Sequence, residues 1–191
     1  MYYTLYEIFN MKICTILSLF LLYTSQIYSQ GIDSIFDNTK YEAKLVITLD
    51  SVKKDEIFSR VKYWIGTTYK SASHVIDVED KSSDIYRIIL KPTMIKVCSY
   101  WGARSDVAVE YVVIIQIKDG KVKIEMQDFY LRGDSYNKIG NGALRDKDKP
   151  YGLPLKCWDE FYRWCKSDCI KLMVNFQDSI KKTAIKIEDD F

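Results

Sequence analysis

Apolar and polar residues alternate most clearly in the middle of the chain. Residues 107–118 are mostly apolar, and residues 121–127 alternate strictly. A period of two is typical of a β-strand with one buried face. The two segments meet at Asp119 and Gly120, a pair that tolerates the positive φ angles of a tight turn. The pattern therefore predicts a β-hairpin with one buried and one solvated face, and the buried side chains of its second arm are Val122, Ile124 and Met126.

Three more segments have the composition of strands. Residues 43–50 alternate, and residues 73–80 form a short segment rich in β-branched residues. Residues 84–100 are predicted to form one long strand that is broken or bulged at Pro92, because proline cannot donate a hydrogen bond to a neighbouring strand. Residues 101–106 are expected to form a loop.

Two segments have apolar residues at helical spacing. In residues 51–69 these are Ile57, Val61, Trp64 and Ile65. Asp50 or Ser51 is available to cap the first amides of this helix. A longer helix is predicted after Pro154, ending near Lys182. Its inward stripe has spacings of three or four residues and consists of Trp158, Phe161, Cys165, Cys169, Leu172, Phe176 and Ile180.

The predicted order of elements is β-α-β-β-β-β-α, with about five strands in an antiparallel sheet whose single apolar face two amphipathic helices can cover. The chain is therefore predicted to be an α+β protein, a two-layer sandwich with both helices packed on one face of the sheet. The single domain is expected to span residues 43–185. A leader of residues 30–42 precedes it, and a charged tail of residues 186–191 follows it.

The N-terminal segment has the features of an export signal. After Met11, Lys12 precedes an apolar core of residues 13–23, and a polar stretch ends at the small residue Ser29. The core is too short to span a bilayer, which takes about 20 apolar residues. Residues 1–10 contain an acid and no base, so Met11 is predicted to be the true start. Residues 1–29 are expected to be an extension plus a cleaved signal peptide, with an uncleaved anchor or a buried helix as the alternative.

The balance of charge excludes some partners. The chain has 28 Lys and Arg residues against 26 Asp and Glu residues, so it has no strong field to attract nucleic acid or an anionic membrane. Acidic and basic residues alternate along the chain, and no aromatic and basic strip for single-stranded nucleic acid is present. We therefore expect no nucleic-acid partner and no stable membrane span after signal cleavage.

Residues 157–169, CWDEFYRWCKSDC, contain three of the five cysteines. Cys165 and Cys169 would hold their Cβ atoms roughly 6 Å apart on a helix, whereas a disulfide needs about 3.8 Å. They are expected to pack as small hydrophobic side chains. In an oxidising compartment, Cys98 is the candidate to form a disulfide with one of Cys157, Cys165 or Cys169. Cysteine spacings of eight and four fit neither a tetrahedral zinc site nor a C-x-x-C redox motif, so no metal and no cofactor are predicted.

The sequence contains no catalytic constellation. His74 is the only histidine, and it lies at the start of a predicted strand without a Gly-x-Ser-x-Gly turn in the chain. An exposed histidine at a strand end is the simplest interpretation. Asp77 and Glu79 share one face of this strand and could ligate a cation or act as paired carboxylates. Solvated edge charges that discourage strand addition explain them more simply.

Residues 132–154 are rich in Gly, Asp, Asn and Lys and are predicted to form a long surface loop. The candidate binding residues of this loop are Arg132, Asp134, Tyr136, Arg145 and Tyr151. Together with Asp77 and Glu79, the candidate acids of a carboxylate-based enzyme are Asp134, Asp146 and Asp148.

Several motifs together resemble a known bacterial family. After the signal peptide and a first strand come KKDEIFSRVKYWI, HVIDVEDKSSDIYRI and IKDGKVKIEMQDF. Over roughly residues 43–131, this combination resembles the domain of unknown function DUF4468, which is described as having a TBP-like fold and occurs largely in exported proteins of the Bacteroidota. The resemblance implies an antiparallel sheet backed by helices and no established activity, and a TBP-like shape does not carry DNA binding with it. Two features depart from the family, namely the absence of glycine from SSDIYRIIL and the cysteine-rich last helix.

These observations favour an exported protein that is periplasmic, associated with the outer envelope or secreted. We expect a non-catalytic binding or accessory module. Its expected partner is an envelope protein or a glycan, bound through the solvated sheet face or the loop of residues 132–154. The alternatives are a carboxylate-based periplasmic enzyme and a thiol redox factor.

Overall fold

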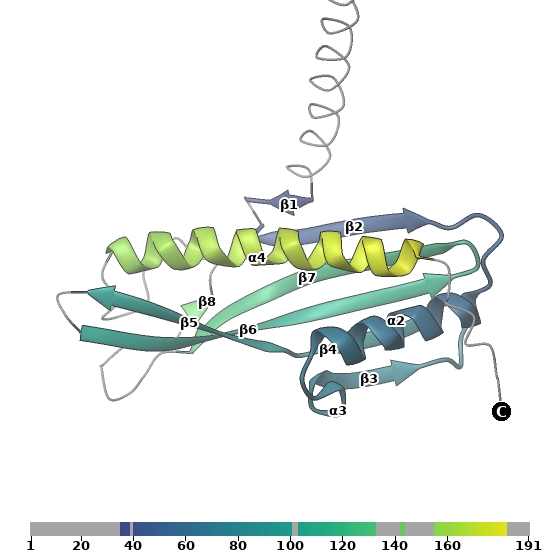
Figure 1. Ribbon diagram of the computed structural model, residues 1–191, viewed down its shortest axis with the longest axis horizontal. Helices are drawn as coiled ribbons and strands as arrows, with labels where there is room; N and C mark the ends of the chain where they lie inside the picture. Colours follow the sequence, from purple (N-terminus) through teal and green to yellow (C-terminus); the bar gives the residue numbers. More distant parts are fainter. Residues whose placement is uncertain (1–34, 39, 101–102, 133–141, 144–154, 183–191) are drawn as a thin grey trace, which may run out of the picture. The chain divides into compact units, whose positions relative to one another are not determined.

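The computed structural model describes residues 35–38, 40–100, 103–132, 142–143 and 155–182, without the side chains of residues 98–100, 103–105, 142, 143, 155, 156 and 158. The chain divides into two units, Met1–Ile35 and Phe36–Phe191. The second unit contains the sheet and its helices (Figure 1).

In the described part of the chain, eight strands form one antiparallel sheet. Six of them follow the order β1-β2-β7-β6-β4-β3; β5 also pairs with β6, and β8 also pairs with β7. The strands are β1 (Phe36–Asp37), β2 (Glu42–Thr48), β3 (Ile76–Asp80), β4 (Tyr86–Leu90), β5 (Thr93–Tyr100), β6 (Ala103–Lys118), β7 (Lys121–Arg132) and β8 (Gly142–Ala143). The sheet is therefore larger than the sheet of about five strands expected from the sequence. The short strands β1 and β8 carry too little pattern to be predicted.

Pro92 separates β4 from β5, as the sequence predicts. The pairing register with β6 does not shift across the break, because Leu90 pairs with Val113 and Thr93 pairs with Glu110. The two strands thus act as one long arm with a local interruption. The expected loop at residues 101–106 is wrong for residues 103–106. These residues belong to β6, which begins at Ala103 and pairs with β5 from that residue onward.

The predicted hairpin is present as β6 and β7, with Lys118 paired to Lys121 across the turn. Only Gly120 of the turn pair has a positive φ, of 68°. A β-bulge lies further along β7, where Asp128 has a φ of 54° and the pairing register shifts by one residue. The extra residue reverses the alternation, so Phe129 and Leu131 face the same side as Met126.

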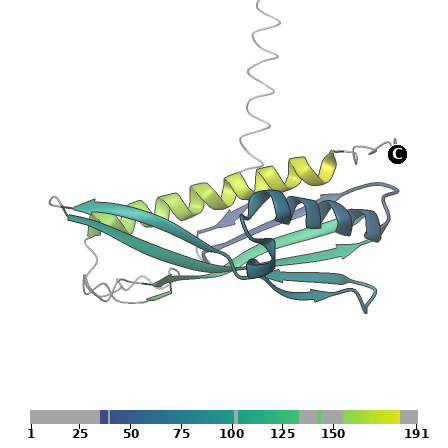
Figure 2. The same ribbon diagram turned by 60° about the horizontal axis from the view of Figure 1, so that its bottom comes forward.

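Two helices, α2 (Lys54–Thr68) and α4 (Leu155–Lys181), lie on the same face of the sheet, as Figures 1 and 2 show together. They pack against each other through Trp64 and Phe176, whose ring centroids are 4.9 Å apart in an edge-to-face arrangement. The indole Nε1 of Trp64 donates a hydrogen bond of 2.8 Å to Asn175 Oδ1. The α+β sandwich with two helices on one face is thereby confirmed.

The buried stripe of α4 contains Cys157, Phe161, Cys165, Cys169, Met173, Phe176 and Ile180. Met173 is fully buried where the sequence analysis placed Leu172, which is only half-buried. The side chain of Trp158 lies outside the described residues. On the sheet, Val122, Ile124 and Met126 are fully buried as predicted. Helix and sheet therefore share one apolar core.

The start of α2 differs from the prediction. Neither Asp50 nor Ser51 caps the helix; its N-cap residue is Lys53, which provides no side-chain hydrogen bond. Instead, Asp119 Oδ1 in the β6–β7 turn accepts a hydrogen bond of 2.8 Å from the Lys54 amide. The cap comes from a residue 65 positions away in the sequence. Local spacing could not reveal it.

The expected leader contributes to the domain. Phe36 of β1 pairs with Ala43 of β2, and Tyr41 is buried at 2% exposure. The Tyr41 hydroxyl donates a hydrogen bond of 3.0 Å to the carbonyl oxygen of Tyr162 on α4. These contacts hold the segment before β2 against the last helix.

Candidate functional site

The face of the sheet opposite α2 and α4 is the candidate binding surface. Directly paired residues of antiparallel strands have their side chains on the same face. Starting from β3, one cross-strand row consists of Val78, Ile89, Ile114, Glu125 and Lys44. A second row, two residues along each strand, consists of Asp80, Arg87, Gln116, Lys123 and Val46. These ten residues are called the open face below.

Three aliphatic side chains lie side by side on the open face. Val78, Ile89 and Ile114 come from β3, β4 and β6, three neighbouring strands. Their sequence neighbours Ile88 and Ile115 are fully buried beneath the helices, whereas Val78 is 39% exposed and Ile89 and Ile114 are half-buried. A solvated sheet face is normally polar. This aliphatic row is therefore apolar surface without a covering element among the described residues.

Charged residues lie along one side of the aliphatic row and at its β7–β2 end. Glu125 forms ion pairs with Lys44 at 3.3 Å and with Lys123 at 2.8 Å. Partial burial acts to raise the pKa of Glu125, but hydrogen bonds from the two lysines outweigh it and lower the pKa overall. At the other end of the open face, hydrogen bonds from the Ser82 hydroxyl and amide lower the pKa of Asp80. The lowered pKa values of Glu125 and Asp80 favour the charged form of both carboxylates.

The two acids that were considered as a catalytic or metal-binding pair each form an ion pair with a different lysine. Asp77 and Glu79 are both exposed on β3. Asp77 forms an ion pair of 3.0 Å with Lys91, whereas Glu79 forms one of 2.6 Å with Lys62 of α2. Among the side chains that the structure describes, no three His, Cys, Asp or Glu residues lie close enough to hold a metal ion. The loop acids Asp134, Asp146 and Asp148 lie outside the described residues.

His74 does not begin a strand. It lies in a one-turn helix, α3 (Ala72–Val75), ahead of β3. Its side chain is exposed, and Nδ1 shares a hydrogen bond with the Ser71 hydroxyl. The strand predicted for residues 73–80 is therefore wrong at its start, where the residues up to Val75 form a helical turn.

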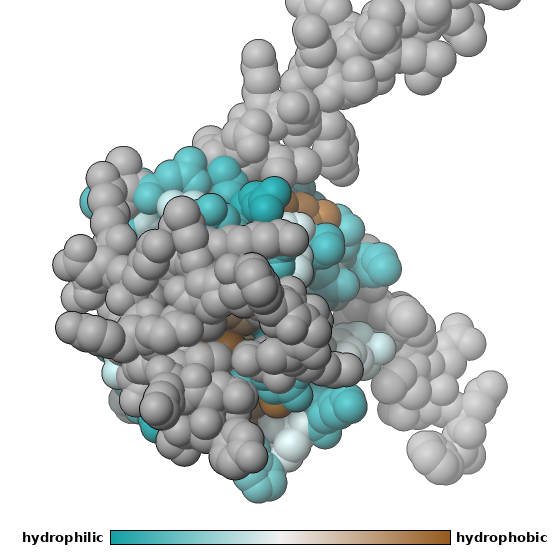
Figure 3. All heavy atoms as spheres, turned by 90° about the vertical axis from the view of Figure 1, so that its left-hand side faces the viewer, coloured by the Kyte–Doolittle hydropathy of each residue, from teal (hydrophilic) through white to brown (hydrophobic). Residues whose placement is uncertain are grey.

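The candidate binding loop of residues 132–154 is described only at Arg132 and at the backbone of β8 (Gly142–Ala143). Arg132 is the last residue of β7 and forms an ion pair of 2.6 Å with Glu110 of β6. Asp134, Tyr136, Arg145 and Tyr151 lie outside the described residues. From this end of the molecule, the visible described residues are mostly hydrophilic with small hydrophobic areas between them (Figure 3).

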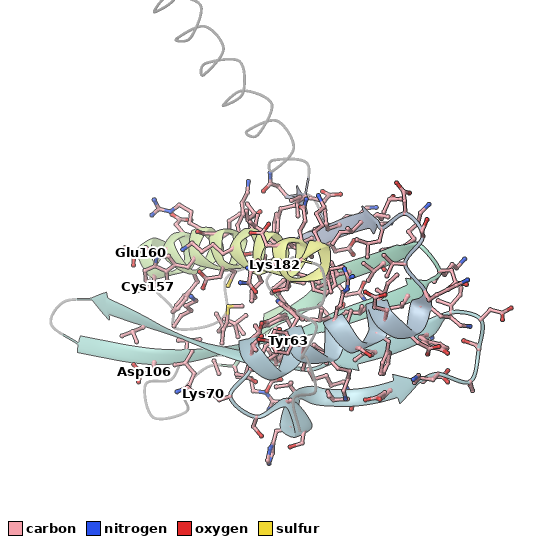
Figure 4. All side chains as sticks on the ribbon, turned by 45° about the vertical axis from the view of Figure 1, so that its right-hand side comes forward. Tyr63, Lys70, Asp106, Cys157, Glu160 and Lys182 are labelled. Carbon is pink, nitrogen blue, oxygen red and sulfur yellow. The ribbon has the colours of Figure 1, made fainter. Side chains whose placement is uncertain are left out.

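The cysteines of α4 fall into two kinds. Cys157 is disulfide-bonded, whereas Cys165 and Cys169 are free, fully buried thiols. The thiol of Cys165 and that of Cys169 therefore cannot be the predicted partner of Cys98. Cys98 lies on β5, but its side chain is outside the described set, so its bond to Cys157 stays a prediction. Figure 4 shows Cys157 beside Glu160 at the start of α4, with Lys182 beyond the other end of the helix.

The sequence analysis missed a polar group of residues between α4 and the sheet. Lys96 of β5 forms an ion pair with Asp168 of α4. Burial raises the pKa of Tyr41 and that of Tyr111 above the ordinary tyrosine value, and it raises the pKa of Tyr69 to about 12. These hydroxyls are therefore protonated at neutral pH. The residues come from five separate elements or connections, so only the fold brings them together.

Comparison with known proteins agrees with this architecture. Residues 44–132 match the family "Domain of unknown function (DUF4468) with TBP-like fold". A crystal structure of a DUF4468 family protein from Bacteroides ovatus is 9% identical, with a TM-score of 0.56, covering 78% of this chain and 91% of that one. A crystal structure of a TBP-like protein from Parabacteroides distasonis is 16% identical, with a TM-score of 0.55, covering 78% of this chain and 97% of that one. No curated protein matches the chain. The family resemblance and the TBP-like α+β fold are thereby confirmed.

Proposed function

For a chain whose residues 44–132 belong to the DUF4468 family, which has no named function, we propose a role as an exported, non-catalytic binding module. Its partner is an envelope protein that docks on the open face. The proposal places the mature protein in the periplasm, at the outer envelope or outside the cell, as the signal-like N-terminus suggests. No helix in the described part of the chain is both long and apolar enough to cross a membrane.

The row of Val78, Ile89 and Ile114 is the observation that supports a binding role. An aliphatic centre with a charged rim is the usual composition of a protein–protein interface. Burying apolar surface contributes roughly 25 cal/mol per Å², so three partly exposed aliphatic side chains supply a useful centre for such a contact. A glycan would be expected to use hydrogen bonds and aromatic faces more than aliphatic ones, and neither row contains an aromatic residue. The chemistry of the open face therefore favours a protein partner.

Site-specific photo-crosslinking in the source cells tests the docking surface. A photoreactive amino acid replaces Gln116, which lies between Arg87 and Lys123 on the open face. The matched control replaces Tyr63, which is 71% exposed on α2 and is labelled in Figure 4. We expect a defined protein adduct from position 116, none from position 63, and loss of the adduct when Ile89→Lys is added. The purified partner should then bind the wild-type chain and not Ile89→Lys.

Three outcomes contradict the proposal. No adduct from position 116 in intact cells would remove the docking surface. Equal adducts from positions 116 and 63 would show non-specific proximity. An adduct that resists proteases and is removed by glycosidases would identify a glycan in place of a protein.

Export is tested separately by determining the N-terminus of the cellular protein. A mature chain that begins at Gln30 is the expected result, since the polar stretch ends at Ser29. A chain that retains residues 1–29 and stays in the cytoplasm would contradict the proposed location.

A further inference from the structure

Sulfur atoms from two elements meet beneath α4. The Sγ atom of Cys165 lies 4.0 Å from the Sδ atom of Met94 on β5. Cys169 lies one helical turn further along the same buried stripe of α4. Cys165 and Cys169 are fully buried, whereas Met94 is half-buried. This group, called the sulfur cluster below, consists of Met94, Cys165 and Cys169.

Cys165 and Cys169 cannot form a disulfide with each other. Residues four apart on a helix have Cβ atoms about 5–6 Å apart, whereas a disulfide requires about 3.8 Å. Both remain free, although Cys157 on the same helix is disulfide-bonded. The helix thus holds the two cysteines on one buried face, with Cβ atoms too far apart for a disulfide between them.

The separation of Cys165 Sγ and Met94 Sδ fits a three-coordinate metal ion. Metal–thiolate bonds are about 2.3 Å long, so the ligand sulfurs of a trigonal planar site lie about 4.0 Å apart, which is 2.3 Å multiplied by the square root of three. The distance between Cys165 Sγ and Met94 Sδ is 4.0 Å. A tetrahedral zinc site would need a fourth ligand, but a trigonal site needs only three. Thiolate and thioether donors select soft ions such as Cu(I).

The surroundings of the sulfur cluster suit a bound ion. Lys96 lies two residues from Met94 on β5 and forms an ion pair with Asp168, the sequence neighbour of Cys169 on α4. The side chain of Lys96 is 20% exposed beside the cluster, so with half-buried Met94 it offers an approach from solvent.

We propose that the sulfur cluster binds a single soft monovalent metal ion, with Cu(I) as the chemical type. Met94 Sδ, Cys165 Sγ and Cys169 Sγ are the three donors. Binding replaces two S–H bonds by two metal–sulfur bonds and releases two protons to solvent. The bound group, Cu(I) with two thiolates and one neutral thioether, carries one negative charge and lies near the ion pair of Lys96 and Asp168. No change of oxidation state is involved.

Competition for Cu(I) under anaerobic conditions tests this site in the full chain. Copper is titrated between the protein and a colorimetric Cu(I) chelator, and thiolate-to-copper charge transfer is followed in the ultraviolet. Met94→Leu removes the thioether while approximately conserving volume. Met126→Leu is the matched control, because Met126 is a fully buried methionine on β7. Circular dichroism confirms that each variant is folded.

We expect the wild-type chain and Met126→Leu to bind one Cu(I) with the same affinity. Met94→Leu should weaken binding at least about tenfold, which corresponds to about 1.4 kcal/mol. Cys165→Ser with Cys169→Ser should abolish the charge-transfer band. Three results would overturn the site: no competition by the wild-type chain, equal affinities for Met94→Leu and Met126→Leu, or retained binding in the double cysteine variant, which would assign the copper to sulfurs elsewhere, such as Cys14.

Discussion

The hydrogen bond between Asp119 and the start of α2 yields a sharp prediction about stability. The turn between β6 and β7 meets the segment before α2 through three hydrogen bonds. Leu49 N–H donates to the Gly120 carbonyl, Gly120 N–H donates to the Val52 carbonyl, and Lys54 N–H donates to Asp119 Oδ1, each at 2.8 Å. Only the last depends on a side chain. Asp119→Ala therefore removes one helix cap and leaves the two backbone bonds in place.

The expected loss of stability in Asp119→Ala follows from the removal of a helix cap. Removing a side-chain acceptor at a helix N-terminus costs about 1 kcal/mol, within a range of roughly 0.5–2 kcal/mol. For a domain of this size, 1 kcal/mol lowers Tm by about 2–4 °C. Asp119→Asn should lose less, since the amide oxygen still accepts the hydrogen bond and Asn-Gly is a good turn pair. Asp50→Ala is the control, because Asp50 is the neighbouring acid that sequence alone favoured as the cap.

Urea unfolding followed by circular dichroism measures all three variants. We expect Asp50→Ala to stay within about 0.5 kcal/mol of the wild type, as for an exposed residue without a special role. The order of stability should be wild type and Asp50→Ala, then Asp119→Asn, then Asp119→Ala. If Asp50→Ala lowers the free energy of unfolding as much as Asp119→Ala does, the helix is capped locally and the long-range cap is refuted.

Three further predictions concern the bulge, the core and the open face. Asp128 has a φ of 54°, so Asp128→Gly should raise the free energy of unfolding by about 1 kcal/mol in urea melts, and Asp128→Val should lower it. Phe161 is fully buried, so Phe161→Ala should lower the free energy of unfolding by about 3–5 kcal/mol, whereas Tyr63→Ala at an exposed site should change it by less than about 0.5 kcal/mol. Hydrogen bonds from Ser82 lower the pKa of Asp80, so Ser82→Ala should raise that pKa in an NMR titration. Because a lowered carboxyl pKa stabilises the fold above the unfolded pKa and this contribution is lost as pH falls, the stability cost of Ser82→Ala should be present at neutral pH and fade in acid; a cost that persists unchanged in acid would refute it.

The fold was predictable where one face of an element is buried along its whole length. The alternation at Val122, Ile124 and Met126 and the stripe through Phe161 and Phe176 each repeat often enough to define a face. The fold class follows from these faces, because a one-sided sheet and two amphipathic helices have few ways to bury them. The two-residue strands β1 and β8 carry no repeat, and pairing with a longer strand defines them instead.

Interactions between distant segments were not predictable. Asp119 replaces Asp50 as the helix cap because the turn and the helix meet only in the folded chain. The bulge at Asp128 changes which residues of β7 face the core, and its positive φ has no signature in the local sequence. The sulfur cluster likewise required β5 to pack beneath α4 before Met94 met Cys165. From the sequence, Cys165 and Cys169 were expected to pack in the core or to be candidate disulfide partners of Cys98.

The apolar residues of β6 occupy both sets of alternate positions, not only the set that faces the helices. In β6, Val113, Ile115 and Ile117 are buried beneath the helices, while Val112 and Ile114, which belong to the alternate set of positions, are also aliphatic. A sheet that is covered on one face needs apolar residues at alternate positions only. The second set therefore does not serve the helix-covered core. Sheet pairing places Ile114 beside Ile89, and Ile89 beside Val78, which extends this second set across three strands. Apolar surface maintained over paired strands and left in contact with water is a cost that a covering partner would offset, and this argument links the pattern of β6 to the proposed binding role.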